Sequence, residues 1–288
     1  MGPLVILGPG TLGLSLARHA AECGLEVRLV GRDFTHARTG AQKVIAIWRR
    51  ALDDGRLDAA TFQVFNERLC PSESLMKALA GAGAMVECLP EDMALKAAVW
   101  SFLGTSWPTE VMPLTASSCL PASLIQETAG CDLWMQNFHL FVPVHRHPVV
   151  EVASPPNTPE IYRFQAQELA KRLELQLVTV QEDLGLAASR MGLIQGLEAM
   201  RLLEAGQATT EALDALMTLG YGHPCGPLEL SDRIGLDLRL SIAEYLHRST
   251  GDCRFEAPNL LKEMVAKGEL GRKSGRGFYT WNPDGTKS

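Results

Sequence analysis

The stretch Leu4-Val5-Ile6-Leu7-Gly8-Pro9-Gly10-Thr11-Leu12-Gly13 decides the fold of this chain. Its four leading apolar residues predict a buried strand, and Leu12, Leu16 and Ala20 then recur four residues apart, as along one face of a helix. A second apolar strand follows at 26–30. A strand, a glycine-rich turn, a helix and a second strand are the context that a dinucleotide-binding G-x-G-x-x-G motif requires.

Each glycine of this motif has its own physical reason. Gly8 permits the tight turn, Gly10 lets backbone amides approach a pyrophosphate, and Gly13 lets the helix press against the strand. Thr11 and Leu12 lie between the last two glycines, where the helix begins. These five residues are the predicted phosphate-binding part of a cofactor site.

The end of the second strand bears on the choice of cofactor. In NAD-binding units an acidic residue about 20 positions after the glycines hydrogen-bonds the ribose 2′-hydroxyl. Gly31 occupies that position here, and Arg32 beside it offers a charged fork suited to a 2′-phosphate. We therefore favour NADP over NAD, with Gly31 and Arg32 in the site. The alternative is that Arg32 is a solvated loop residue and Asp33 binds the ribose instead.

Composition limits the class of protein. A chain of 288 residues fits two domains, and its net charge of -6, without a basic stripe, predicts no nucleic-acid partner. The start of the chain has no charged leader and no long apolar segment follows, so we expect a cytoplasmic protein without a membrane span. Seven scattered cysteines without a CxxC pair predict reduced thiols and no bound metal.

Strand and helix signals alternate through the first two thirds of the chain. The predicted strands are 84–89, 110–114, 137–142, 149–152 and 176–180, with a short one around 64–65, and the predicted helices are 35–54, 95–103 and 160–173. This alternation predicts an α/β fold: a Rossmann-type, doubly wound and mostly parallel sheet covered on both faces.

Beyond Gly185 the strand signals cease, and apolar residues recur at helical spacing, as at Met191, Ile194, Leu197 and Met200. We therefore predict a dinucleotide-binding domain at 1–183 and an all-α domain at 184–288 that serves substrate binding and dimerisation. The same apolar residues also fit an intramolecular core, so the expected homodimer rests on the pattern alone.

One pair of residues suggests acid–base chemistry. His139 lies on a predicted strand and Glu151 follows twelve residues later on the next strand, so the two can meet across a hairpin-like excursion. In such a pair the carboxylate fixes the imidazole tautomer and stabilises the imidazolium that forms when the ring accepts a proton. Spacing alone does not decide the role, because chance pairs of histidines and acids are common.

Motifs along the whole chain resemble the 3-hydroxyacyl-CoA dehydrogenase family, and they occur in that family's order. They are VECLPED at 86–92 with Lys96, SSCL at 117–120, FHLFVPV at 138–144, VVEV at 149–152, GHPCGPLEL at 222–230, GLD at 235–237 and LGRKSGRGFY at 270–279. The resemblance includes the 3-hydroxybutyryl-CoA dehydrogenases, and SSCL resembles the lambda-crystallin-like branch as well. Several motifs in order are more specific than any single one.

The resemblance implies roles for individual residues. His139 matches the family's base, Glu151 the acid that orients it, and Ser118 the serine that hydrogen-bonds the substrate oxygen. A neutral imidazole can take and return a proton, and a hydroxyl can both donate and accept a hydrogen bond. Three further matches imply cofactor contacts, namely Glu91, Lys96 and Lys273.

The chain departs from the family pattern at Gly31 with Arg32, in the loop at 145–147, and at two positions where the family has asparagine. Ser189 stands where the family usually has the asparagine that holds the substrate carbonyl, and Val142 where it commonly has an asparagine near the nicotinamide. Ser189 can still donate a hydrogen bond, with a shorter reach, and remains a candidate catalytic residue. These departures bear on the substrate more than on the reaction, because proton abstraction needs only His139 and Glu151.

The sequence therefore predicts an NAD(P)-dependent oxidoreductase of fatty-acid metabolism that acts on a short 3-hydroxyacyl-CoA such as 3-hydroxybutyryl-CoA. A second hypothesis keeps the hydride transfer but makes the substrate a free hydroxyacid or sugar acid, as in the lambda-crystallin-like branch. A third hypothesis is a nucleotide-binding structural or sensor protein that has lost catalysis.

Overall fold

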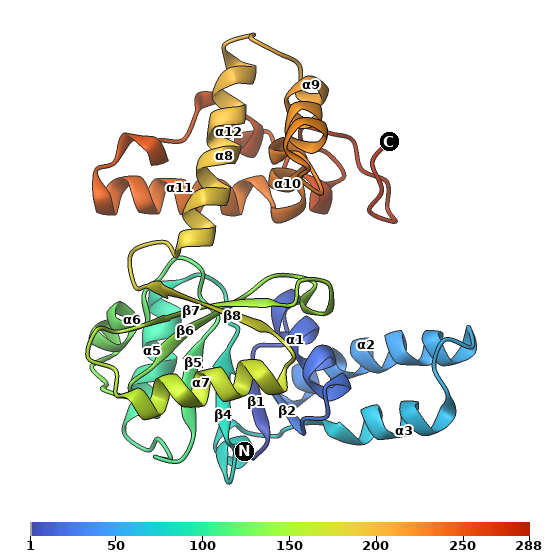
Figure 1. Ribbon diagram of the computed structural model, residues 1–288, viewed down its shortest axis with the longest axis vertical. Coiled ribbons are helices and arrows are strands. Elements are labelled where there is room, and N and C mark those ends of the chain that lie inside the picture. The colour runs from blue at the N-terminus through green and yellow to red at the C-terminus, as the bar shows by residue number, and fades with distance from the viewer. Residues whose placement is uncertain (1) are drawn as a thin grey trace. The chain divides into compact units, whose positions relative to one another are not determined.

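A computed structural model describes residues 2–288, and its internal contacts divide the chain into two compact units. The first unit ends at Leu186 and the second begins at Ala187. The predicted fold class is confirmed: a doubly wound, mostly parallel sheet with flanking helices is followed by a helical unit (Figure 1).

An eight-stranded sheet in the order β3-β2-β1-β4-β5-β6-β7-β8 forms the centre of the first unit. Its strands are β1 (Leu4–Leu7), β2 (Val27–Val30), β3 (Leu69–Pro71), β4 (Ala84–Glu87), β5 (Met112–Thr115), β6 (Gln136–Leu140), β7 (Val149–Ser154) and β8 (Gln176–Gln181). Only the β6–β7 pair is antiparallel among these neighbours. The chain leaves β1 toward β2 and β4 toward β5, so a topological switch point lies between β1 and β4.

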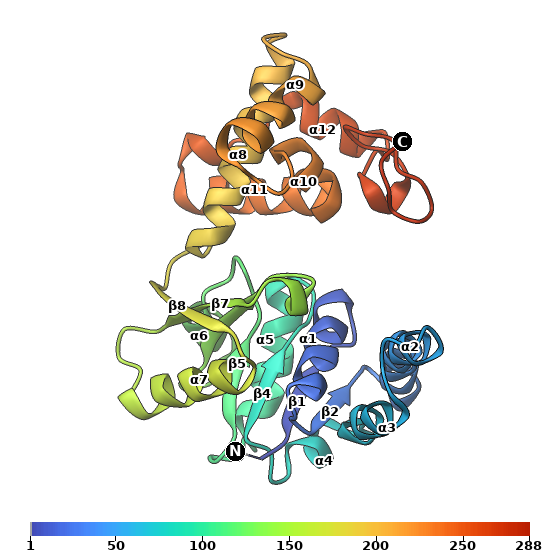
Figure 2. The same ribbon diagram turned by 45° about the vertical axis from the view of Figure 1, so that its right-hand side comes forward.

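Helices cover both faces of this sheet (Figures 1 and 2). They are α1 (Thr11–Glu22), α2 (Phe34–Asp53), α3 (Ala59–Arg68), α4 (Leu75–Leu79), α5 (Met93–Gly104), α6 (Ala122–Ala129) and α7 (Glu160–Arg172). On one face, Ile6 and Val86 of the sheet share a core with Leu16 of α1 and Leu169 of α7. The helices α5 and α6 pack side by side on the other face.

One predicted element is wrong. The apolar pair Val64-Phe65 lies in α3 rather than in a strand. The Asp58 side chain accepts a hydrogen bond from the Thr61 amide at 2.9 Å and so caps the helix N-terminus. The strand in this part of the chain is β3, which begins only at Leu69.

The second unit is helical and is described here by itself. Its helices are α8 (Ala187–Glu204), α9 (Thr210–Ala215), α10 (Pro227–Ile234), α11 (Leu236–Thr250) and α12 (Asn259–Ala266), with a π-helical turn η2 (Leu216–Gly220) and short 3₁₀ turns η3 (Cys253–Phe255) and η4 (Arg272–Ser274). Asp232 of α10 ties down the C-terminal segment by accepting hydrogen bonds from the Phe278 and Tyr279 amides, each at 2.9 Å. No helix within residues 2–288 is long and apolar enough to cross a membrane.

Candidate active site

The glycine loop between β1 and α1 is shaped by steric limits. Gly8 has a φ of 111°, which favours glycine, and a Cβ added at Gly13 would lie 1.9 Å from the Gly8 carbonyl oxygen. Nothing lies within 4 Å of where a Cβ of Gly10 would be. No side chain caps the N-terminus of α1, and its first turn holds no acid, with Thr11 exposed and Leu12 half-buried. An uncapped helix N-terminus beside open glycine backbone fits a pyrophosphate.

The polar residues that follow β2 differ in their exposure and in their hydrogen-bond partners. Arg32 is exposed, with its Nε 3.4 Å from Asp33 Oδ2. Asp33 caps α2 by accepting a hydrogen bond from the His36 amide at 2.7 Å, which holds the pKa of this carboxyl below its ordinary value. Gly31 packs tightly, because an added Cβ would lie 2.9 Å from the Ala37 nitrogen. The His36 Nδ1 is buried there without a partner among the described residues.

His139 and Glu151 meet on neighbouring strands. The antiparallel register of β6 and β7 places the two residues directly opposite each other, and His139 Nδ1 lies 2.8 Å from Glu151 Oε2. His139 is 9% exposed and Glu151 3% exposed. Because a carboxylate can only accept, Nδ1 carries the proton in this contact, and the neutral ring keeps its lone pair on Nε2. The ring can therefore accept a proton at Nε2 while Glu151 stabilises the resulting charge.

Ser118 lies on the loop at 116–121 that follows β5. Its hydroxyl lies 3.5 Å from Cys119 Sγ, and its backbone carbonyl accepts a hydrogen bond from the Leu186 amide at 3.0 Å. Burial raises the pKa of the neighbouring Cys119 thiol to about 12, which keeps this thiol protonated at neutral pH. Among Ser118 and Cys119, the hydroxyl is thus the hydrogen-bonding group suited to a substrate oxygen.

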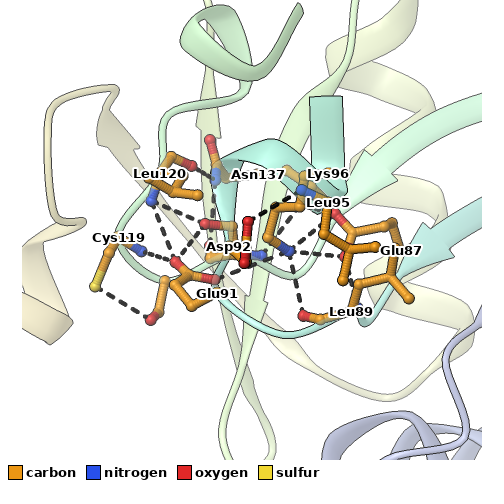
Figure 3. A network of polar contacts seen from close by, with 12 residues as sticks. Glu87, Leu89, Glu91, Asp92, Leu95, Lys96, Cys119, Leu120 and Asn137 are labelled. Atoms are coloured by element: carbon orange, nitrogen blue, oxygen red, sulfur yellow. Dashed lines mark hydrogen bonds and ion pairs between the residues drawn. The ribbon is translucent and has the colours of Figure 1, made fainter. Parts of the chain in front are cut away.

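Glu91 holds the same loop from the segment before α5. Its Oε1 accepts hydrogen bonds from the Ser117 hydroxyl at 2.6 Å and from the Cys119 and Leu120 amides at 2.7 and 3.2 Å (Figure 3). One carboxylate oxygen therefore binds three donors, from Ser117, Cys119 and Leu120, on either side of Ser118. The other oxygen, Oε2, lies 3.8 Å from Lys96 Nζ.

Lys96 belongs to a buried polar network rather than to the exposed surface. Its Nζ lies 2.7 and 3.0 Å from the two oxygens of Glu87, the last residue of β4, and 3.3 Å from the Leu89 carbonyl oxygen. Glu87 also accepts hydrogen bonds from the Thr115 hydroxyl at 2.9 Å and the Leu89 amide at 2.6 Å. Both charged side chains are at most 1% exposed. The ammonium group thus lies between Glu91 and Glu87, at the carboxyl ends of β4 and β5.

The remaining predicted site residues lie in the second unit. Ser189 is half-buried in the first turn of α8. Lys273 lies in η4, and its Nζ donates to Asp237 Oδ1 and Oδ2 at 2.6 and 2.5 Å. This ion pair lowers the pKa of Asp237, although burial acts against it. Lys273 keeps half of its side chain exposed.

Sequence reasoning assigned no role to two buried polar residues near Ser118. Glu87 pairs with Lys96, and Asn137 of β6 makes three hydrogen bonds to the segment 117–122 (Figure 3). For Glu87 the available signal was a single charged residue in an otherwise apolar strand, which must find a partner when buried, whereas Asn137 lies in a strand that also holds Gln136 and His139 and gave no such signal.

Two family models cover nearly the whole chain. Residues 4–184 match the NAD binding domain of 3-hydroxyacyl-CoA dehydrogenase, and residues 185–281 match its C-terminal domain. The chain belongs to the 3-hydroxyacyl-CoA dehydrogenase family. It is accordingly an oxidoreductase of this family with a domain for a nicotinamide cofactor.

Individual relatives agree with this family assignment. A probable 3-hydroxybutyryl-CoA dehydrogenase from Bacillus subtilis is 31% identical over 96% of both chains. The crystal structure of FadB2 from M. tuberculosis has a TM-score of 0.91 at 27% identity, covering 98% of this chain and 99% of that one. That of (S)-3-hydroxybutyryl-CoA dehydrogenase PaaH1 from Ralstonia eutropha has a TM-score of 0.88 at 28% identity, covering 97% and 99%.

Proposed function

We propose that this protein is an NAD(P)-dependent dehydrogenase that interconverts the 3-hydroxyl and 3-oxo groups of a short acyl-CoA, such as 3-hydroxybutyryl-CoA. The observation that carries the proposal is the buried His139–Glu151 pair in a chain of this family. Gly8, Gly10 and Gly13 of the glycine loop would hold the pyrophosphate of a nicotinamide cofactor, which would supply or accept the hydride at substrate C3. The substrate then needs a group that exchanges the hydroxyl proton.

His139 takes that proton on Nε2 during oxidation and returns it during reduction. Glu151 keeps Nδ1 protonated, so the imidazole faces the substrate with its lone pair, and it stabilises the imidazolium that forms. The Ser118 hydroxyl donates a hydrogen bond to the same substrate oxygen. Preorganised donors of this kind are worth about 10² to 10³ in turnover each.

The direct test is an assay of acetoacetyl-CoA reduction, in which the rate is measured as the consumption of reduced cofactor. We expect turnover by the wild-type protein, loss of turnover in His139→Gln, and wild-type rates in a matched control, His247→Gln. The half-buried His247 ring lies in the second unit, where its Nδ1 is 3.0 Å from the Asp252 carbonyl oxygen. A wild-type protein that binds cofactor but reduces no thioester refutes the proposed substrate. An unchanged rate in His139→Gln refutes the proposed base.

NADP is our proposed cofactor. Asp33 is engaged in capping α2, whereas Arg32 is exposed and adjacent to a glycine where a carboxylate would repel a 2′-phosphate. We expect Arg32→Ala to weaken NADPH binding at least about tenfold and NADH binding less than twofold, because only the 2′-phosphate is contacted. Arg38→Ala, an exposed arginine of α2, is the control. Wild-type protein that binds NADH ten times more tightly than NADPH refutes this choice.

A free hydroxyacid or sugar acid is the second candidate substrate. Ser189 and Val142 depart from the family pattern at positions for which the resemblance implies contacts with the thioester and the nicotinamide, and Val142 is 44% exposed. A diketoreductase with substrate-directed dual catalysis of dicarbonyl compounds is 25% identical to this chain, with a TM-score of 0.80. Kinetics on acetoacetyl-CoA beside a panel of free oxoacids separates the two candidates by kcat/KM.

A homodimer formed through the unit that begins at Ala187 is the proposed assembly. Two side chains near the π-helical turn, Leu219 and Tyr221, are 86% and 77% exposed. Large exposed apolar side chains that lie together are typical of interaction surfaces. Light scattering after size exclusion measures the mass, and a mass near 31 kDa refutes the dimer.

A further inference from the structure

The loop that carries Ser118 is held from two directions. Glu91 binds its amides from the segment before α5, as described above. Asn137 of β6 holds the loop's carbonyls: its Nδ2 donates to the Ser117 oxygen at 3.2 Å and to the Leu120 oxygen at 2.9 Å. Figure 3 shows Asn137 and Glu91 both reaching the stretch that ends at Leu120.

Both polar atoms of the Asn137 side chain form hydrogen bonds with the segment 117–122. Its Oδ1 accepts a hydrogen bond from the amide of Ala122, the first residue of α6, at 2.8 Å. The residue is fully buried. The three hydrogen bonds all hold one segment, from the residue before Ser118 to the start of α6.

His139 lies on the same strand as Asn137, whose three hydrogen bonds to the segment 117–122 we call the clamp. Successive side chains of a strand point to opposite faces, so Asn137 and His139, two residues apart, share one face of β6. The backbone between them is held by the neighbouring strands β5 and β7. The spacing between the Ser118 loop and the His139 ring therefore depends on a short rigid path through Asn137.

We propose that Asn137 is a positioning residue that sets the distance between the Ser118 hydroxyl and the His139 imidazole. The inference rests on the proposed function, in which both groups meet one substrate oxygen. Misplacing such a group by about 1 Å costs about 10²-fold in rate. An apolar residue at 137 would leave two loop carbonyls and one helix amide without their partner.

The chain offers a matched control on the same strand. Gln136 is also fully buried, but it faces the other side of β6, where its amide donates to the Tyr162 oxygen at 3.0 Å and accepts from the Ser154 hydroxyl at 2.7 Å. Gln136→Ala removes a buried amide and its hydrogen bonds without touching the Ser118 loop. A general loss of stability in β6 affects both variants, whereas a positioning role affects only one.

The kinetic test is a double-mutant cycle. For Asn137→Ala we expect kcat to fall about 30-fold or more with cofactor affinity within about twofold, and for Gln136→Ala a kcat within about threefold of wild type. In a Ser118→Ala background, Asn137→Ala should lower kcat less than about threefold further, because it acts through Ser118. Fully additive losses, or equal losses in both alanine variants, overturn the proposal.

A second measurement does not depend on turnover. Hydrogen exchange should be faster at the amides of Cys119 and Leu120 in Asn137→Asp than in Gln136→Ala, because a carboxylate at 137 keeps the Ala122 contact but repels the two loop carbonyls. This isosteric variant also covers the case in which Asn137→Ala does not fold. Unchanged exchange overturns the clamp. Failure of the proposed function is seen separately, as a wild-type protein inactive on every oxo substrate.

Discussion

Replacing Glu151 by glutamine tests the central pair of the proposed site. The change is isosteric, so packing in β7 is retained, but it removes the negative charge 2.8 Å from His139 Nδ1. It also presents an amide nitrogen that can donate to Nδ1 and so favour the wrong tautomer. Both effects reduce the ability of Nε2 to take the substrate proton.

The size of the loss follows from Coulomb's law. Two unit charges about 4 Å apart interact by about 4 kcal/mol at an effective dielectric constant of about 20, which suits a site that water barely reaches. Glu151 is 3% exposed and His139 9% exposed, so screening by solvent is weak. Because each 1.36 kcal/mol is tenfold, the imidazolium-forming step should slow about 10³-fold.

The assay is the steady-state reduction of acetoacetyl-CoA, with cofactor binding measured separately by fluorescence titration. We expect kcat to fall about 10³-fold while cofactor affinity changes less than about threefold. Glu160→Gln, at the exposed start of α7, is the control and should match the wild type. A loss below tenfold with an intact fold would show that Glu151 does not assist proton transfer, and the proposed mechanism would fail.

Three further predictions concern reactivity and stability. The Cys119 thiol, with a pKa of about 12, is ionised in about one molecule in 10⁴ at pH 8. Iodoacetamide should therefore label the exposed Cys253 well before Cys119, as measured by peptide mass spectrometry. Equal labelling rates at the two cysteines would contradict this prediction. Arg239→Met should raise the free energy of unfolding by about 1–3 kcal/mol in urea titrations. The residue is 4% exposed, two of its guanidinium nitrogens have no partner within residues 2–288, and burial lowers its pKa to about 10, so folding disfavours the charged form present at neutral pH. A fall in the urea midpoint would argue against this prediction. Leu16→Ala, in the core of the first unit, should cost about 2–5 kcal/mol, whereas Leu95→Ala, 40% exposed, should cost far less; equal losses would refute the packing argument.

Patterns repeated over many residues predicted the fold. The apolar run at 4–7 is wholly buried in β1, and the glycine spacing reflects contacts that a Cβ would prevent, as at Gly13. A two-residue signal was insufficient: Val64 and Phe65 carry apolar side chains but no period, so the nearby cap at Asp58 decided for a helix. The fold class depends on the long patterns, so assigning a strand instead of a helix at Val64-Phe65 did not change it.

Spacing along the sequence also predicted one contact of the candidate site. His139 and Glu151 are joined by an excursion within one hairpin-like pair of strands, and the observed register places them opposite each other. Ser118 lies in the loop after β5 and Asn137 in strand β6, and no spacing between 118 and 137 indicates which backbone atoms an amide will reach. Such contacts depend on how two neighbouring strands of the sheet end, which only the three-dimensional structure gives.

The buried ion pair shows what a sequence rule can still recover. Glu87 is the only charge in the apolar strand 84–89, and Lys96 is the only charge in the apolar stretch 93–104 of the next helix. A lone buried charge costs several kcal/mol unless an opposite charge neutralises it. One carboxylate at the end of a buried strand and one ammonium in the following buried helix must therefore meet, as they do at 2.7 Å. The resemblance to known enzymes implied a cofactor contact for Lys96, whereas the charge balance of its own surroundings points to Glu87 as its first partner.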